Sequence, residues 1–485
     1  MPEVVKKNIG LTQAEKYLGR LCEKSFLSLW SYPGLFRESG TELCDLLVVF
    51  ENDIIIFSDK DRAFPNTGNL LNDWNKWHRK TVVKSAKQAW GAERWIKNFP
   101  QQIFLDAKCK HAFPFELPDV RKANFHLVAV AHQASKACKA FHGGSGSLMI
   151  SNDNVFATAS GMPFVIGDLD EKKTFVHVLD DTTLDLVMKN VDTITDFVRY
   201  LSKRERLMRS STKILAAGEE ELLSYYLKNI NSKGEHDFVW PNKDANIIAL
   251  AESVWENFEN NPQRVEQKKA DEVSYFWDSI IESFARNALA GTQYFKQEEG
   301  LKNSEKILRF LAKTSRFERR ILSKGLIEIL NKTPKHLRMV RCLPPIKKGD
   351  PYFVLLLFPW RNDKSERVNR EVRAGFLDAC CRVVKLRYPD AEDIVGIATE
   401  TGREAWGSED AAYLDGRKWT KELEEDAKKL QSELGILVKP KFFRIHEKEY
   451  PENKRVEKIN ELPKNPRNKK CPCGSGLKYK KCHGK

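Results

Sequence analysis

Long apolar runs are missing from this 485-residue chain. The longest, around residues 353–358, is far shorter than the roughly 18 residues that a membrane-spanning helix needs. The first thirty residues carry acids and bases throughout and lack the continuous apolar core of a secretory signal. We therefore expect a cytoplasmic protein that has no contact with a membrane.

A disulfide framework is also missing. Seven of the ten cysteines are scattered, mostly in apolar surroundings, which is typical of reduced core thiols in an intracellular protein. The other three crowd into the last fifteen residues, where such spacing indicates a metal site. The scattered cysteines are Cys22, Cys44, Cys109, Cys138, Cys342, Cys380 and Cys381.

Two common catalytic motifs are absent. The glycine-rich run at 143–147 is not followed by Gly-Lys-Ser/Thr, so it is not a phosphate-binding P-loop. No Gly-x-Ser-x-Gly nucleophile elbow occurs. The sequence also shows no internal repeat, which leaves a chain of this length to fold as two to four ordinary domains.

Acidic residues are absent from the C-terminal tail. Residues 464–485 contain eight Lys or Arg and no Asp or Glu, more than half of the formal net charge of +14. A basic balance suits a polyanionic partner such as nucleic acid, and it suits simple solubility equally well.

The hydrophobic pattern predicts a mixed α/β (α+β) fold. Residues 1–40 have helical spacing, and two short apolar runs around Glu51-Asn52-Asp53 then predict a β-hairpin over 44–57. A long helix is expected at 71–98. Further strands are expected at 103–105, 125–131, 148–150 and 175–179, and a further helix at 184–208.

The pattern beyond residue 210 changes twice. Nearly everything up to residue 340 looks helical, with 245–258 as a clear example. A strand, a helix and a strand at 352–358, 365–386 and 393–399 then predict a βαβ unit with a parallel pair. We expect five parts: an α/β domain at 1–210, a helical region at 211–340, a βαβ-containing domain at 341–446, a charged linker at 447–468 and a metal-binding knuckle at 469–485.

The last residues carry a zinc-ligand pattern. Cys471, Cys473, Cys482 and His483 offer the four N or S donors that a tetrahedral zinc ion takes in closed structural sites. The glycines between them allow the sharp turn that a module of this size needs. This ending resembles the SEC-C motif, which implies a zinc-dependent module that docks on protein or nucleic acid.

A second set of candidate residues surrounds the hairpin. Metal-dependent phosphodiester cleavage needs carboxylates that hold Mg²⁺ or Mn²⁺ and a cation near the scissile phosphate. Asp45, Lys60 and Gln88 resemble the PD-(D/E)xK, or restriction-endonuclease-like, superfamily. The resemblance implies that Asp45 holds the metal, that Lys60 is the catalytic lysine, that Glu42 is the helix carboxylate and that Gln88 supports the site.

One position departs from that pattern. Strand side chains alternate between faces, so Lys60 shares a face with Ser58, where an acid is expected, and not with Asp59. Asp59 then reaches the metal through a bulge, Glu42 or Glu51 substitutes for it, or the site is inactive. A competing Asp-x-Lys pattern occurs at 106–108.

Residues 1–205 also resemble an uncharacterised bacterial protein family. The expected function is a metal-dependent nuclease that acts on DNA or RNA in bacterial defence or nucleic-acid processing, with the zinc knuckle as a docking tail. The alternative is a zinc-containing adaptor without enzymatic activity, which binds nucleic acid, a ribosome or a protein partner. The oligomeric state stays open.

Overall fold

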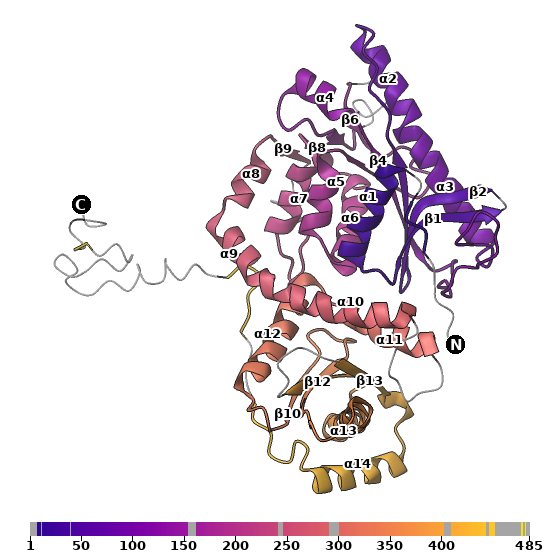
Figure 1. The fold of residues 1–485 in the computed structure, drawn as a ribbon. Coiled ribbons are helices and arrows are strands. Elements are labelled where there is room, and N and C mark those ends of the chain that lie inside the picture. Colours follow the sequence, from indigo (N-terminus) through magenta and orange to yellow (C-terminus); the bar gives the residue numbers. More distant parts are fainter. Residues whose placement is uncertain are drawn as a thin grey trace.

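A computed structural model describes residues 7–10, 12–38, 40–153, 162–240, 246–290, 300–401, 409–442, 446–451, 477, 478 and 481. Figure 1 shows an N-terminal body and a smaller C-terminal body, with the helices α10 (Tyr275–Ala290), α11 (Gly300–Ala312) and α12 (Arg316–Lys332) lying between them. In the part of the chain so described, no helix is both long enough and apolar enough to cross a bilayer. The expected mixed α/β fold class is confirmed.

The N-terminal body is built on a five-stranded sheet with the order β1-β2-β3-β4-β7. The first three strands are antiparallel, and β3, β4 and β7 are parallel. The predicted hairpin is confirmed as β2 and β3, with Glu51 in the left-handed region at φ 55°. The strands are β1 (Ser31–Glu38), β2 (Thr41–Phe50), β3 (Asp53–Lys60), β4 (Asn124–Ala131) and β7 (Val176–Asp180).

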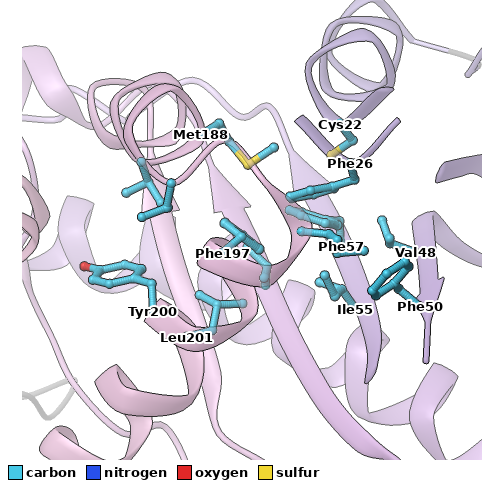
Figure 2. Packing of buried hydrophobic residues seen from close by; sticks show 14 of the residues in the cluster. Cys22, Phe26, Val48, Phe50, Ile55, Phe57, Met188, Phe197, Tyr200 and Leu201 are labelled. Atoms are coloured by element: carbon cyan, nitrogen blue, oxygen red, sulfur yellow. The ribbon is translucent and has the colours of Figure 1, made fainter. Parts of the chain in front are cut away.

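Both faces of this sheet are covered, which is why its central strands are continuously apolar. The helices α1 (Gln13–Phe26) and α6 (Ile194–Met208) cover one face. Figure 2 shows Phe26 and Phe197 against Phe57 of β3, with ring centroids 4.9 Å apart for Phe26 and Phe197 and 6.2 Å for Phe57 and Phe197. These buried rings make the centre of the core.

The helix α3 (Val82–Asn98) covers the opposite face. Its inward positions are small residues such as Ala86 and Ala89, which let the helix lie close to the sheet. The expectation of one long helix at 71–98 is wrong, because α2 (Leu70–Lys80) ends at Thr81, where the chain turns before α3 begins. The Thr81 hydroxyl donates to the Trp77 carbonyl oxygen over 2.6 Å and closes the end of α2.

A second sheet, with the order β6-β5-β8-β9, joins segments on either side of residue 210. The expected helix at 245–258 is therefore wrong in its first half, because residues Ile247–Leu250 form strand β9. The expected helix at 184–208 is divided into α5 and α6. The further elements of this body are α4 (Ser135–His142), β5 (Met149–Ser151), β6 (Val165–Ile166), α5 (Thr183–Asn190), β8 (Lys213–Ala216), α7 (Glu219–Lys228), β9 (Ile247–Leu250) and α8 (Val254–Glu259).

The C-terminal body is a four-stranded sheet with the order β10-β11-β12-β13. The predicted βαβ unit is confirmed, since β11 and β12 are parallel and α13 connects them. Its elements, and the helices that precede it, are α9 (Pro262–Asp271), η1 (Glu272–Ser274), α10 (Tyr275–Ala290), α11 (Gly300–Ala312), α12 (Arg316–Lys332), β10 (Met339–Leu343), β11 (Tyr352–Pro359), α13 (Glu366–Arg387), β12 (Asp393–Thr401), β13 (Glu409–Asp415), η2 (Gly416–Lys418) and α14 (Lys421–Leu434).

A short strap at residues 446–451 crosses the helices between the two bodies. The fully buried Arg320 donates from Nη2 to the carbonyl oxygens of Lys448 and Glu449, over 3.0 and 3.2 Å. The Tyr450 hydroxyl donates to the carbonyl oxygen of Leu227 in α7 over 2.5 Å. The strap is therefore fixed to helices of both the middle and the N-terminal body.

Candidate active site

Asp45 of β2 lies at the centre of the candidate site. Its side chain is buried at 3% exposure, and its carboxylate accepts three hydrogen bonds. Gln88 donates to Oδ1 over 3.2 Å, Lys60 donates to Oδ2 over 3.4 Å, and the backbone N–H of Asp59 also donates to Oδ2. Burial raises the pKa of Asp45, while Lys60 and the Asp59 N–H oppose that rise.

Gln88 connects α3 to both strands of the hairpin. Its Oε1 accepts a hydrogen bond from the Ser58 hydroxyl over 3.2 Å, while its amide nitrogen binds Asp45. Ser58 lies on the face of β3 that α3 covers, and its neighbour Phe57 points to the other face. The expected alternation along β3 is thus observed, and the hydroxyl of Ser58 occupies the position where the superfamily pattern has an acid.

Lys60 lies at the end of β3 with its side chain 20% exposed. Its ammonium group contacts Asp45 and also donates to the carbonyl oxygen of Asp59 over 3.1 Å. Asp45, Lys60 and Gln88, which are separated by up to 43 positions in the sequence, are therefore brought together.

The Asp59 side chain makes no hydrogen bond within this cluster, although its charge contributes to the raised pKa of Asp45. Its Oδ1 lies 2.9 Å from Nε2 of His132, whose Nδ1 lies 2.8 Å from Asp181. Burial alone would lower the pKa of His132, but the two carboxylates outweigh it and raise that pKa to about 10. A protonated His132 between two carboxylates therefore holds Asp59 away from Asp45, and no bulge turns Asp59 toward Asp45.

Glu42 lies on β2, so the expectation that it is a helix carboxylate is wrong. The pairing of β1 with β2 is irregular here. Leu35 pairs with Cys44 and the next residue, Phe36, pairs with Glu42, so Leu43 is an extra residue on β2. A β-bulge of this kind changes the direction of nearby side chains. Glu42 Oε1 is buried and has no hydrogen-bond partner among the described residues. Burial raises the pKa of Glu42 to about 7, with further contributions from Asp45 and Glu15.

The helix carboxylate near the site is Glu15 of α1, which the sequence analysis missed. Glu15 acts electrostatically on both Asp45 and Glu42. It also forms a capping box with Thr12 at the start of α1, and the Thr-x-x-Glu spacing was the available sequence signal. His132 and Asp181 were missed too, since nothing local links them to the hairpin.

The competing Asp-x-Lys pattern has a different role. Asp106 accepts hydrogen bonds from the backbone N–H groups of Lys108, Lys110 and His111, over 2.9 to 3.1 Å. This carboxylate therefore closes a surface turn. Glu51, a further candidate acid, lies at the tip of the hairpin, 3.7 Å from Lys313.

The comparisons with known proteins concern the tail. The SEC-C motif matches residues 467–485. No curated protein and no solved structure matches the chain. The expected ligands Cys471, Cys473, Cys482 and His483 fall inside the matched segment but outside the described residues. SEC-C motifs generally bind zinc, which is consistent with a structural zinc ion. The chain thus carries a SEC-C motif at its C-terminal end.

Proposed function

We propose that the N-terminal body is a nuclease, a hydrolase that cuts DNA or RNA with the help of Mg²⁺ or Mn²⁺. The observation that carries the proposal is the meeting of Asp45, Lys60 and Gln88 on one face of the sheet. They come from β2, β3 and α3. Asp45 is of the type that holds the metal ion in phosphodiester cleavage, Lys60 supplies the cation, and Gln88 holds the Asp45 carboxylate. Nothing in the packing of a hairpin demands a buried acid, a lysine and an amide at one point.

The donor set is suited to Mg²⁺, which takes one or two carboxylates and completes its shell with water and substrate phosphate. Asp45 and Glu42 would hold the ion, and the unpartnered Oε1 of Glu42 is the observation that favours this pair. No three His, Cys, Asp or Glu side chains of the described chain form a metal-binding group. The bound cation would stabilise the charge that develops on the phosphate.

The remaining residues have separate roles in this proposal. Lys60 would orient the attacking water or bind the scissile phosphate, because its partly exposed ammonium lies beside Asp45. Gln88 would keep the Asp45 carboxylate in place through its own bond to Ser58. Asp59 contributes its backbone N–H, since its carboxylate is held by His132.

A second candidate is a zinc-containing adaptor without enzymatic activity. The specific observation in its favour is that the Asp45 carboxylate already accepts three protein hydrogen bonds while Asp59 is paired elsewhere. In this candidate the N-terminal body only binds, and the basic SEC-C tail docks on nucleic acid, a ribosome or a protein. Zinc held by Cys471, Cys473, Cys482 and His483 would stabilise the docking module.

The two candidates separate in one cleavage assay. Single- and double-stranded DNA and RNA are incubated with the full chain and Mg²⁺ or Mn²⁺, and with EDTA. We expect metal-dependent cutting that is lost in Asp45→Asn and Lys60→Ala. The matched control is Lys108→Ala, from the second Asp-x-Lys pattern, which should cut like the natural chain. Binding without cutting on every substrate would favour the adaptor, and cutting by Asp45→Asn would contradict the assigned site.

A further inference from the structure

The helices α2 and α3 carry an unusual distribution of charge. Seven of their Lys and Arg side chains are exposed, and Lys97 alone among these seven pairs with an acid, Glu93, one turn away. Their only two acids, Asp73 and Glu93, are buried and already bound, the first to Thr67 and the second to Lys97 and Thr174. The outer surface of the helix pair is therefore positive without any carboxylate of its own. The other six exposed cations are Lys76, Arg79, Lys80, Lys84, Lys87 and Arg94.

Two other surface helices pair cations with acids one turn away. On α14, Lys428 lies 2.9 Å from Glu424, and on α12, Lys332 lies 2.6 Å from Glu328, each one turn away. Such spacing is the usual way in which a solvated helix face balances its charge. None of the six cations on α2 and α3 makes an ion pair or a side-chain hydrogen bond with a described residue.

The cations are also aligned. Lys84, Lys87 and Arg94 follow one another at intervals of three and seven residues, and so lie on one face along the length of α3. We call these three residues the cationic stripe. Gly91 lies on the same face, four residues after Lys87 and three before Arg94. A Cβ added at Gly91 would meet no atom within 4 Å. The helix backbone is thus open to a close ligand at that point.

The dimensions suit a polyanion. Lys84 and Arg94 are ten residues apart, or about 15 Å along the helix at 1.5 Å per residue. A duplex strand carries one phosphate per ~3.4 Å of axis, so the distance spans about four phosphates. Figure 1 shows α2 and α3 at the outer edge of the N-terminal body, where a long ligand has access.

The stripe also borders the candidate active site. Gln88 follows Lys87 directly and turns inward, where it binds Asp45 and Ser58. The same helix therefore presents cations to the solvent and an amide to the buried carboxylate. A strand lying along the stripe would pass beside the hairpin end where Lys60 is exposed.

We propose that the cationic stripe binds the sugar–phosphate backbone of a nucleic acid and holds it beside Asp45 and Lys60. The binding stands on the charge and geometry of α2 and α3. The placement beside Asp45 rests on the proposed nuclease function.

The test is a binding assay on the full chain in EDTA, so that no cutting interferes. The probes are fluorescent 20-residue single-stranded DNA and RNA and the matching duplexes, each titrated at several salt concentrations. The variant is Lys84→Gln with Lys87→Gln and Arg94→Gln. The control is Lys269→Gln with Lys332→Gln and Lys428→Gln, which removes the same charge from cations that have acidic partners. Circular dichroism confirms that both variants fold.

Each lost phosphate contact lowers the slope of log affinity against log salt by about 0.9 on duplex and about 0.7 on single strands. For the three substituted cations, the slope of the stripe variant should therefore be smaller by about 2.7 on duplex and by about 2 on single strands. Its affinity at 0.1 M salt should fall by roughly 10²-fold or more. The control should bind like the natural chain. The probe that the natural chain binds most tightly identifies the preferred nucleic acid.

Three outcomes would overturn the proposal: no binding by the natural chain, an unchanged slope in the stripe variant, or an equal loss in the control. An unchanged slope would mean that other cations of the chain, those of the SEC-C tail included, make the phosphate contacts. Cleavage with Mg²⁺ separates this result from the nuclease proposal. Binding through the stripe without cutting would refute the nuclease alone, and normal cutting by the stripe variant would refute the stripe alone.

Discussion

His132 gives a prediction whose magnitude follows from the structure. The ring lies between the carboxylates of Asp59 and Asp181, and replacing it by glutamine removes the charge while keeping a hydrogen-bond donor. Because the pKa of His132 is about 10 instead of 6.5, protonation favours the folded state. That contribution is complete below pH 6.5 and is lost as the pH rises toward 10.

The magnitude can be bounded. Each tenfold change in proton affinity is worth about 1.4 kcal/mol, so the shift corresponds to at most about 5 kcal/mol. The ring is 18% exposed, and water screens part of the interaction. We therefore expect His132→Gln to lower the free energy of unfolding by about 2 to 3 kcal/mol at pH 6 and by much less at pH 10.

The assay is urea unfolding followed by tryptophan fluorescence and circular dichroism at pH 6, 8 and 10. The difference between the natural chain and His132→Gln should shrink steadily over this range. His142→Gln is the control, because the His142 ring contacts the carbonyl oxygen of Pro163. A difference for His132→Gln that is the same at every pH, or is absent at pH 6, would refute the reasoning.

Two further predictions concern a buried ion pair and the metal tail. Arg204 and Glu219 are both 2% exposed and share three hydrogen bonds of 2.8 to 3.0 Å, so Arg204→Met should lower the free energy of unfolding by about 3 to 5 kcal/mol in urea unfolding. Adding Glu219→Leu to this variant should recover most of that loss. A loss below about 1 kcal/mol for Arg204→Met alone would contradict the prediction. Cys471→Ser should reduce bound zinc from about one ion per chain to near zero by metal analysis. Retention of zinc would exclude Cys471 as a ligand.

The hairpin was predictable because its signals are local. Two continuous apolar runs with a short polar turn between them define β2 and β3, and their register fixes which side chains share a face. The placement of Ser58 and Lys60 on one face of β3, with Asp59 on the other, follows from strand geometry alone. The approach of Gln88 to Asp45 required the superfamily resemblance, because a helix thirty residues later has no local link to the hairpin.

Strand β1 was missed for a physical reason. It contains Pro33 and Gly34, a pair that usually marks a turn. At the edge of a sheet a proline costs no ladder hydrogen bond, so the pair is tolerated there. The expectation of helix up to residue 40 therefore failed where tertiary pairing with β2 outweighed the local pattern.

The residues around Asp59 were beyond local reasoning as well. His132 and Asp181 follow the ends of β4 and β7, which meet Asp59 only because the three parallel strands end at the same edge of the sheet. Glu15 reaches the site through the packing of α1 on β2. Such contacts depend on the topology, which the sequence pattern alone does not specify.

The strap at 446–451 determines where the chain can be shortened. A shortened form that ends before residue 446 would take from Arg320 the two carbonyl oxygens it binds, and would leave a fully buried guanidinium short of acceptors. A form that ends just after residue 451 keeps those contacts and removes only the linker and the SEC-C tail. The boundary between a clean deletion and a damaging one thus lies within a few residues of Tyr450.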